Sequence, residues 1–425
     1  MRKVAITGLG VVSPIGIGIE KFWESLITGR TTAKKIEELK SSTLFSEKNN
    51  FKSKVSIEVE DFDISNYKVP SDIKNLDRFI QFAVVAAEQA KVDSGLNNRS
   101  NELDLDRVGV SLSTAICGTK QMEEEFVKVT NKGLDNINPS MVSSTLYLSS
   151  MSNTPANVIA SILGAEGPCI TLSTGCIGGI DAIGYAYEQI KNGYADVMVT
   201  GASEAPITPI SYGAFDVINC LSTNFNSDPS KASRPYDRNR DGFLLSEGSG
   251  ILILEEYEHA KKRNAKIYGF ISGFSNASNA LHMTDLVNNG EDLARVIQNA
   301  MREAHLNPDE IDYINGHGSS TPQNDKCETK AIKLAFGNSA KSIPISSTKS
   351  MTGHPLSAAS ALEIIACVLS CNNNILHPTI NYEESDPDCD LDYIPNVSRE
   401  KNIKNIISIA SGFSGLHAAV VIQGC

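Results

Sequence analysis

The sequence lacks three features that would assign it quickly to a common class of protein. No apolar run approaches the roughly 18 residues of a transmembrane helix. The nine cysteines include no C-x-x-C pair of the kind that binds zinc or forms a redox dithiol. Acidic residues outnumber basic ones, 50 to 38, and no basic stripe stands out. We therefore expect no membrane, metal or nucleic-acid partner, and the scattered cysteines favour a reducing cytoplasm.

Motifs for common cofactors and nucleophiles are also absent. Gly8-Leu9-Gly10 begins like a dinucleotide-binding loop, but Ser13 takes the place of the third glycine and Pro14 follows it. The sequence contains no Walker loop and no G-x-S-x-G nucleophile elbow, so no bound cofactor is implied. The run Val4–Val12 is short and rich in glycine, and it predicts a first β-strand rather than a signal peptide.

A single cysteine stands between an apolar run and an amphipathic segment. Cys169–Leu172 predicts a strand, and apolar residues recur at helical spacing from Ile180 to Ile190. The turn Ser173–Gly179 between them would place Cys176 in the first helical turn, where free N–H groups and the helix dipole favour a thiolate. The pattern predicts a nucleophile with a lowered pKa; the alternative is a buried structural cysteine.

The second half of the chain, of 425 residues in all, repeats the predicted elements of the first half in the same order. The matching strands are Ile267–Ser272 with Val4–Gly8, Asp312–Gly316 with Arg107–Leu112, Ser346–Thr348 with Thr171–Ser173, and Asn405–Ala410 with Val197–Gly201. Thr352-Gly353-His354 before an Ala/Ser/Leu-rich helix matches Thr174-Gly175-Cys176. This order predicts a duplicated α/β unit with both motifs at helix starts facing one cleft.

The remaining segments receive simpler interpretations. Residues 77–90 predict a mostly buried helix, and residues 30–70 are polar and irregular, which indicates surface structure. Residues 115–160 are rich in Ser, Thr, Asn and Met, which indicates inserted loops that line a pocket or an interface. A charged helix near residue 260 joins an N-terminal half, 1–258, that carries the cysteine to a C-terminal half, 259–425.

Two histidines have a setting that favours catalysis. His317 and His354 lie in glycine-flanked turns at the ends of predicted strands, in register with Cys176, and Pro355 stands at a favourable first helical position. His417, near the glycine turn 412–415, receives no predicted role. The other four lie in charged or loop segments and are predicted at the surface: His259, His282, His305 and His377.

One cysteine and two histidines suit the formation of a carbon–carbon bond from thioesters. Cys176 would take an acyl group as its own thioester, and a malonyl-type thioester would then lose carbon dioxide. The enolate that develops needs hydrogen-bond donors held in place beforehand, which the imidazole N–H groups of His317 and His354 can supply. Backbone N–H groups of Cys176 and of the turn Ser411–Gly415 would bind the second oxyanion.

Three charged residues accompany this group. Lys349 and Glu328 are candidates for a buried pair that orients the histidines, and Asp325 lies close to Glu328 in sequence. The alternative is that all three are ordinary surface charges. Sequence alone leaves both interpretations open.

At these residues the chain resembles the β-ketoacyl-acyl-carrier-protein synthases, which are condensing enzymes of the thiolase fold. The similarity runs nearly end to end, through Val4–Pro14, Arg234–Asp237, Asp241–Phe243 and Ser411–Phe413. It implies an α/β fold of five layers, α/β/α/β/α, with two duplicated halves, and an obligate dimer. The implied site is Cys176 as nucleophile, His317 and His354 as the decarboxylation pair, Lys349 as their supporter, Phe413 as gate and oxyanion-hole residue, and Glu328, Asp325, Ser319 and Thr321 as supporting residues.

Within this family, several short segments of the sequence are similar to the ketosynthase α subunit of type II polyketide synthases. Gly175 stands where fatty-acid enzymes commonly have Ala, and the segments Ile180–Ala186, Gln323–Thr329 and Asp386–Pro395 follow that subgroup. The resemblance implies malonyl and acyl thioesters on an acyl carrier protein as substrates. It also implies a heterodimer with a chain-length factor that lacks the cysteine. Lys74 lies where related enzymes place carrier-docking residues, although an ordinary solvated lysine is the alternative.

The chain departs from the family pattern at one turn, and other functions stay open. Gly412–His417 replaces the usual Gly-Phe-Gly-Gly and introduces Ser414, Leu416 and His417, which affects the shape of the gate. One alternative is a homodimeric fatty-acid elongation synthase, and another is a scaffold subunit whose cysteine is incidental. A degradative thiolase is disfavoured, because the turn Ser411–Gly415 holds no second cysteine.

Overall fold

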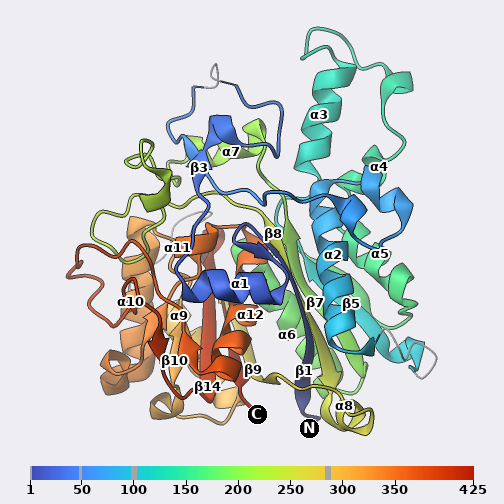
Figure 1. The fold of residues 1–425 in the computed structure, drawn as a ribbon. Helices are drawn as coiled ribbons and strands as arrows, with labels where there is room; N and C mark the ends of the chain where they lie inside the picture. The colour runs from blue at the N-terminus through green and yellow to red at the C-terminus, as the bar shows by residue number, and fades with distance from the viewer. Residues whose placement is uncertain (1, 47–49, 97–102, 283–288) are drawn as a thin grey trace.

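A mixed β-sheet of eleven strands forms the frame of the molecule (Figure 1). The structure is a computed structural model and describes residues 2–46, 50–96, 103–282 and 289–425. Ten strands follow the order β11-β10-β14-β15-β9-β1-β8-β7-β5-β6, and β2 pairs with β1. Their bounds are β1 Val4–Ser13, β2 Gly16–Ile17, β5 Val108–Ser113, β6 Cys169–Leu172, β7 Val197–Glu204, β8 Gly248–Glu256, β9 Gly269–Ser278, β10 Tyr313–Asn315, β11 Ile345–Ser346, β14 Asn405–Gly412 and β15 Leu416–Gln423.

The strand order consists of two equivalent halves. β5 runs parallel to β6 and β7, and β8 is antiparallel to β7 and β1. β10 is likewise parallel to β11 and β14, and β15 is antiparallel to β14 and β9. The halves join through an antiparallel pairing of Val4–Ile6 with Gly269–Ile271. The predicted duplication is confirmed, and β8 with β15 adds a fifth matching pair that sequence comparison did not find.

Helices cover both half-sheets and fill the space between them. Their bounds are α1 Ile19–Ile27, α2 Arg78–Asp93, α3 Thr119–Val129, α4 Leu146–Ser150, α5 Thr154–Leu163, α6 Gly178–Lys191, α7 Pro209–Val217, α8 Tyr257–Lys262, α9 Glu291–Glu303, α10 Pro322–Phe336, α11 Lys349–Thr352 and α12 Ser357–Asn373. Two small antiparallel sheets of two strands each complete the described structure, β3 Lys34–Lys35 with β4 Val55–Ser56 and β12 Ile375–Leu376 with β13 Arg399–Glu400.

The elements stack in the five layers that the resemblance implied (Figure 1). α6 and α12 form the central layer, and their apolar side chains share one buried cluster with β1, β8, β14 and β15. α2 and α5 cover the outer face of the first half-sheet, and α9 and α10 cover the outer face of the second. Gly179 allows α6 and α12 to approach closely, because an added Cβ there would lie 2.6 Å from the backbone N of Ala361. Cys176 and His354 both lie just ahead of this central helix pair.

Two sequence interpretations need correction. Residues 115–160 contain α3, α4 and most of α5 rather than only loops, and α5 packs Ala156 and Ile159 into the cluster beneath α2. The segment 30–70 is not purely surface structure, because Val55 and Ile57 are fully buried; its residues 47–49 lie outside the described residues. Over the described ranges, no helix is long and apolar enough to cross a membrane.

Candidate active site

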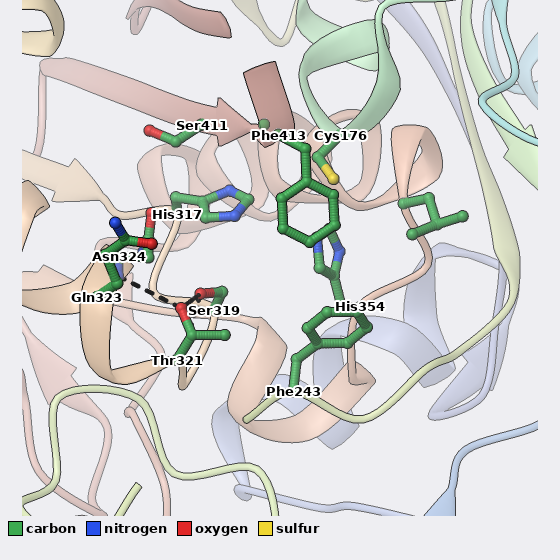
Figure 2. Close-up of a pocket in the computed structure, with 12 residues that line it drawn as sticks. Cys176, Phe243, His317, Ser319, Thr321, Gln323, Asn324, His354, Ser411 and Phe413 are labelled. Atoms are coloured by element: carbon green, nitrogen blue, oxygen red, sulfur yellow. Dashed lines mark hydrogen bonds between the residues drawn. The ribbon is translucent and has the colours of Figure 1, made fainter. Parts of the chain in front are cut away.

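A cavity next to the central helices collects the side chains that the sequence singled out (Figure 2). Cys176 reaches it from the start of α6, His317 from the loop after β10, and His354 from the loop between α11 and α12. The space between the lining side chains, with its mouth, is about 490 Å³. Its lining comprises Cys176, Phe243, His317, Ser319, Thr321, Gln323, Asn324, His354, Leu356, Ser411, Gly412 and Phe413. One thiol and two imidazoles from distant parts of the chain therefore share one space.

The thiol of Cys176 does not have the lowered pKa that its helix-start position predicted. It lies in a 3-10 turn, Gly175–Ile177, directly before α6, and Gly175 adopts a left-handed φ of 61° there. Burial raises the pKa of this thiol to about 12, although the nearby Lys349 cation opposes the rise. The prediction is wrong because withdrawing a thiolate from water outweighs the dipole at the helix start. The resting form is the neutral thiol.

The two cavity histidines face each other nearly at right angles. The ring centroids of His317 and His354 are 5.3 Å apart, with an angle of 81° between the rings. Both are buried, and burial together with the Lys349 cation holds the pKa of each well below its usual value. Neutral imidazoles each carry one N–H, so the pair can donate two hydrogen bonds at neutral pH.

Close backbone packing holds His317 in place. It follows β10 between two glycines, and an added Cβ at Gly316 would lie 2.2 Å from the hydroxyl of Tyr236. Gly318 has a φ of 39°, and a Cβ there would lie 2.5 Å from the Cβ of Ser347. Glycine on both sides is therefore a steric requirement of this loop.

His354 is held in place by Phe243 and Leu244, which precede β8. The backbone N–H of His354 donates to the backbone carbonyl of Leu244 at 2.8 Å. The imidazole ring meets the ring of Phe243 edge-on, with centroids 5.0 Å apart. The expectation that Pro355 opens the helix is wrong, because α12 begins at Ser357. Leu356, between them, has a φ of 44°, a conformation that costs energy for a side chain with a Cβ.

Lys349 is buried, but its partner is not the one predicted. Its ammonium group forms an ion pair with Glu363 of α12, and the two side chains are 1% and 0% exposed. The predicted pairing with Glu328 is therefore wrong. Glu363 is a residue that sequence analysis missed, and its signal was a single carboxylate within the otherwise apolar helix Ser357–Asn373.

Glu328 and Asp325 support the histidine loop from α10. Both are fully buried, so the surface interpretation is wrong. Glu328 accepts hydrogen bonds from the N–H of Gly318 at 2.9 Å and from the hydroxyl of Tyr236 at 2.8 Å. Asp325 accepts from the N–H of Tyr236 at 2.8 Å and lies 3.4 Å from the guanidinium of Arg240. These carboxylates fix the backbone on the C-terminal side of His317.

Hydroxyl groups and a phenyl ring border the cavity. The hydroxyls of Ser319 and Thr321 are 2.8 Å apart, and Thr321 caps the start of α10 (Figure 2). Phe413 is 38% exposed and stands beside Cys176 in the same view. Gly412 lies next to the Cys176 turn, because an added Cβ would be in van der Waals contact with the backbone N of Cys176 at 3.6 Å.

The turn that departs from the family pattern has a distinct geometry. Ser414 has a left-handed φ of 67°, which a glycine would adopt more readily. Leu416 is half-buried at the start of β15. His417 is buried, and its Nδ1 lies 2.9 Å from the hydroxyl of Ser411, a cavity residue on the neighbouring strand. Burial lowers the pKa of His417 to about 4, so it is neutral.

The predicted surface position of His377 is wrong. Its side chain is fully buried, and its ring nitrogens lie within hydrogen-bond distance of the hydroxyls of Tyr313 and Ser346. His282 and His305 are exposed as predicted, and His259 is partly exposed and pairs with Glu255. Sequence could not separate His377 from these, because its burial arises from strands that are distant in the chain.

Two family matches account for most of the chain. Residues 1–260 match the family described as beta-ketoacyl synthase, N-terminal domain, and residues 268–383 match beta-ketoacyl synthase, C-terminal domain. The chain belongs to the beta-ketoacyl synthase family. It is therefore an enzyme of the acyltransferase type that condenses acyl thioesters.

Relatives of two kinds are similar over the full length. The tetracenomycin polyketide synthase ketoacyl synthase alpha subunit of Streptomyces glaucescens is 41% identical, over 99% of this chain and 97% of the relative. The 3-oxoacyl-[acyl-carrier-protein] synthase 2 of Synechocystis sp. is also 41% identical, over 99% and 98%. Identity alone does not separate a polyketide from a fatty-acid enzyme.

Solved structures share the fold and point to the polyketide branch. A type II polyketide synthase ketosynthase, AntDE, in complex with its acyl-carrier protein AntF and bound to the hexaketide, has a TM-score of 0.91 and 42% identity, covering 100% of this chain and 99% of that chain. The ishigamide ketosynthase/chain length factor has a TM-score of 0.88 and 31% identity, with coverage of 100% and 99%.

Proposed function

We propose that this chain is the catalytic α ketosynthase of a type II polyketide synthase, which extends a Cys176-bound chain with malonyl units. The observation that carries the proposal is the meeting of Cys176 with the two neutral imidazoles of His317 and His354 in one cavity. The likeness to ketosynthase alpha subunits over the whole chain supports the polyketide branch. In this proposal the half 1–258 supplies the thiol and the half 259–425 supplies the imidazoles.

The first half-reaction loads the chain onto the enzyme. The sulfur of Cys176 attacks the carbonyl carbon of an acyl thioester on a carrier protein, and the bond from that carbon to the carrier sulfur breaks. The carrier leaves as a thiol and takes up the proton that Cys176 gives up. Backbone N–H groups of Cys176 and Phe413 donate to the oxyanion that forms in between. Ser319 and Thr321, at the cavity wall, bind the carrier arm through their hydroxyls.

The second half-reaction forms the carbon–carbon bond. A malonyl thioester enters, and the bond between its α-carbon and its carboxylate carbon breaks. Carbon dioxide leaves, and the electron pair of that bond stays on the thioester as an enolate whose negative charge lies largely on the oxygen. His317 and His354 donate their N–H groups to that oxygen. The enolate carbon then attacks the acyl carbonyl on Cys176, the carbon–sulfur bond breaks, and the Cys176 thiolate regains a proton from solvent. The Lys349 cation, held in place by Glu363, lowers the pKa of both histidines and so keeps the rings neutral.

A chain-length factor is the proposed partner, and the free edge of the first half-sheet is the proposed contact. β6 is the end strand of the sheet, and its Cys169 is exposed. Large apolar side chains are exposed nearby on and between α3 and α4, namely Phe126, Leu134, Ile137, Met141, Tyr147 and Leu148. A second chain of the same fold would cover both features. One of the similar solved structures is itself a ketosynthase with a chain length factor.

Carrier docking and location complete the proposal. Lys74 is exposed at a surface groove that both basic and acidic side chains line, and it is the proposed contact for an acidic carrier protein. All nine cysteines are free thiols, which supports a reducing cytoplasm.

Purification of the chain alone and together with any ketosynthase-like product of a neighbouring gene tests the proposal. We expect condensation of malonyl-carrier units only when both chains are present, with poly-β-keto chains accumulating on the carrier protein. The second candidate, a homodimeric fatty-acid synthase, is favoured by the equal identity to the Synechocystis enzyme. Activity of the chain alone, yielding fatty acids when reductases are added, would select that candidate.

A further inference from the structure

Glu204 is a buried carboxylate beside the cavity that none of the roles above uses. It is the last residue of β7 and is fully buried. Its side chain accepts hydrogen bonds from the N–H of Ala115, from the N–H of Ile116 at 3.4 Å and from the hydroxyl of Ser357 at 2.5 Å. One carboxylate thus connects the loop after β5 to the first residue of α12.

Both segments that Glu204 connects contribute to the apolar packing around the cysteine. Ala115 and Ile116 pack against the apolar cluster that contains Cys176. Ser357 directly follows Leu356, which belongs to the same cluster and also lines the cavity. Leu356 thus borders the cavity beside Cys176, and Ile116 packs against the same apolar cluster, which is chemically suited to an acyl chain on the sulfur.

Leu356 needs an external restraint to keep its place. Its φ of 44° and ψ of −120° lie outside the regions that residues with a Cβ adopt readily. Such conformations persist when the surrounding structure holds them, and they cluster at functional sites. The hydrogen bond from the next residue, Ser357, to Glu204 is such a restraint.

We propose that Glu204 is a positioning residue that fixes Ile116 and Leu356 as the two walls of the acyl-binding cavity beside Cys176. The inference rests on the proposed function, because the walls receive an acyl chain only if Cys176 carries one. A long acyl chain touches both walls, whereas an acetyl group is too short to reach past the thioester. Loss of Glu204 therefore weakens the use of long chains and spares short ones.

The expected signature is a change in substrate binding rather than in chemical rate. Walls that contact the remote part of the chain bind the ground state and the transition state alike, so their loss raises KM with little effect on kcat. A merely structural carboxylate would lower the activity with all chain lengths together. The dependence on acyl length is thus the observable that separates the two.

The test measures acylation of Cys176 by acetyl and octanoyl thioesters of N-acetylcysteamine, with intact-protein mass spectrometry of the full chain and its partner. We expect Glu204→Gln to raise the half-saturating octanoyl concentration about tenfold, because the amide cannot accept all the hydrogen bonds of the buried carboxyl group. The maximal rate stays within about threefold. The acetyl thioester reacts as with wild type. Ser357→Ala, which removes one of the three hydrogen bonds, shifts the octanoyl value in the same direction by less.

Asp312→Asn is the control. Asp312 also accepts hydrogen bonds from two backbone N–H groups, those of Lys404 and Asn405, but neither it nor the segments it connects belong to the apolar cluster that contains Cys176. The substitution should leave the reaction with both thioesters unaffected. Equal losses for acetyl and octanoyl in Glu204→Gln, or the same octanoyl shift in Asp312→Asn, would overturn the proposal.

Hydrogen exchange separates this inference from the proposed function. The amides of Ala115 and Ile116 should exchange faster in Glu204→Gln than in wild type, whether or not Cys176 accepts acyl groups. Unchanged exchange overturns the positioning role. A wild-type enzyme that takes up neither thioester on Cys176, with the exchange result as expected, overturns the proposed function and the acyl role while the positioning of the loop stands.

Discussion

Lys349 and Glu363 form an ion pair that is closed off from solvent, and the cation lies close enough to lower the pKa of both cavity histidines. The pair links the short helix α11 to the central helix α12. Because the pair is buried, water cannot solvate one of the charges if the other is removed.

Removing one member of this pair should destabilise the fold strongly. We expect Glu363→Gln to lower the free energy of unfolding by about 3–5 kcal/mol, because Lys349 is left as an uncompensated buried charge. Urea denaturation followed by circular dichroism measures the change. Glu258→Gln is the control, since its pair with Lys261 is exposed and should contribute less than about 1 kcal/mol. Equal small effects in both variants would contradict the buried position of the pair.

Cys176→Ala should abolish condensation and leave decarboxylation of the malonyl thioester in place. The acyl acceptor is lost, whereas the two imidazole donors remain. Carbon dioxide release and the acyl adduct, followed separately by radiolabel and by mass spectrometry, measure the two steps. Cys220→Ala is the control, because Cys220 is buried in the same apolar cluster. Product formation that survives in Cys176→Ala would instead support the scaffold hypothesis.

The raised pKa of Cys176 predicts a steep pH dependence of alkylation. Only the thiolate reacts with iodoacetamide, and a pKa of about 12 leaves little thiolate near neutral pH. The labelling rate should therefore rise about tenfold for each pH unit between pH 7 and 10. Free cysteine, with a pKa of about 8.5, should level off in that range. A plateau for the Cys176 peptide below pH 9 would show that the thiol ionises far more easily.

Loss of either cavity histidine should affect decarboxylation more than acyl transfer. We expect His317→Ala and His354→Ala each to slow malonyl decarboxylation about a hundredfold, as for removal of one oxyanion donor. Acylation of Cys176 should change less, and the exposed His305→Ala should change neither rate. Equal losses in the two half-reactions would argue against separate roles.

The same histidines should give the decarboxylation rate no pH dependence of their own near neutrality. Burial holds the pKa of His317 and His354 well below the usual value near 6.5, so both stay neutral as the pH rises from 6 to 8. Neither ring should therefore give the decarboxylation rate an inflection in that interval. An inflection that remains in both His317→Ala and His354→Ala would come from another group, such as Glu328, whose pKa burial raises to about 7. An inflection near pH 6.5 that His354→Ala removes would mean that one ring is protonated in the working enzyme.

Local sequence patterns predicted most of the regular elements. The apolar run Val4–Val12 is β1, and the buried helix near residues 77–90 is α2, capped by Asp77. These predictions hold because side-chain alternation and helical spacing depend on neighbours along the chain. The prediction for segment 115–160 failed because α4 is only five residues long, and because α5 packs against α2 and β5, which are distant in sequence.

The sequence by itself determined that a strand, a glycine turn and a helix follow one another around Cys176, and that a second such unit carries His354. It also identified Cys176 and His354 as the residues in those turns, because the adjacent glycines mark each turn in the local sequence. Only the tertiary structure decided that Lys349 pairs with Glu363, that His377 is buried and that the pKa of Cys176 rises. Ion pairing and desolvation depend on which distant segments exclude water from a side chain, and no local pattern records that.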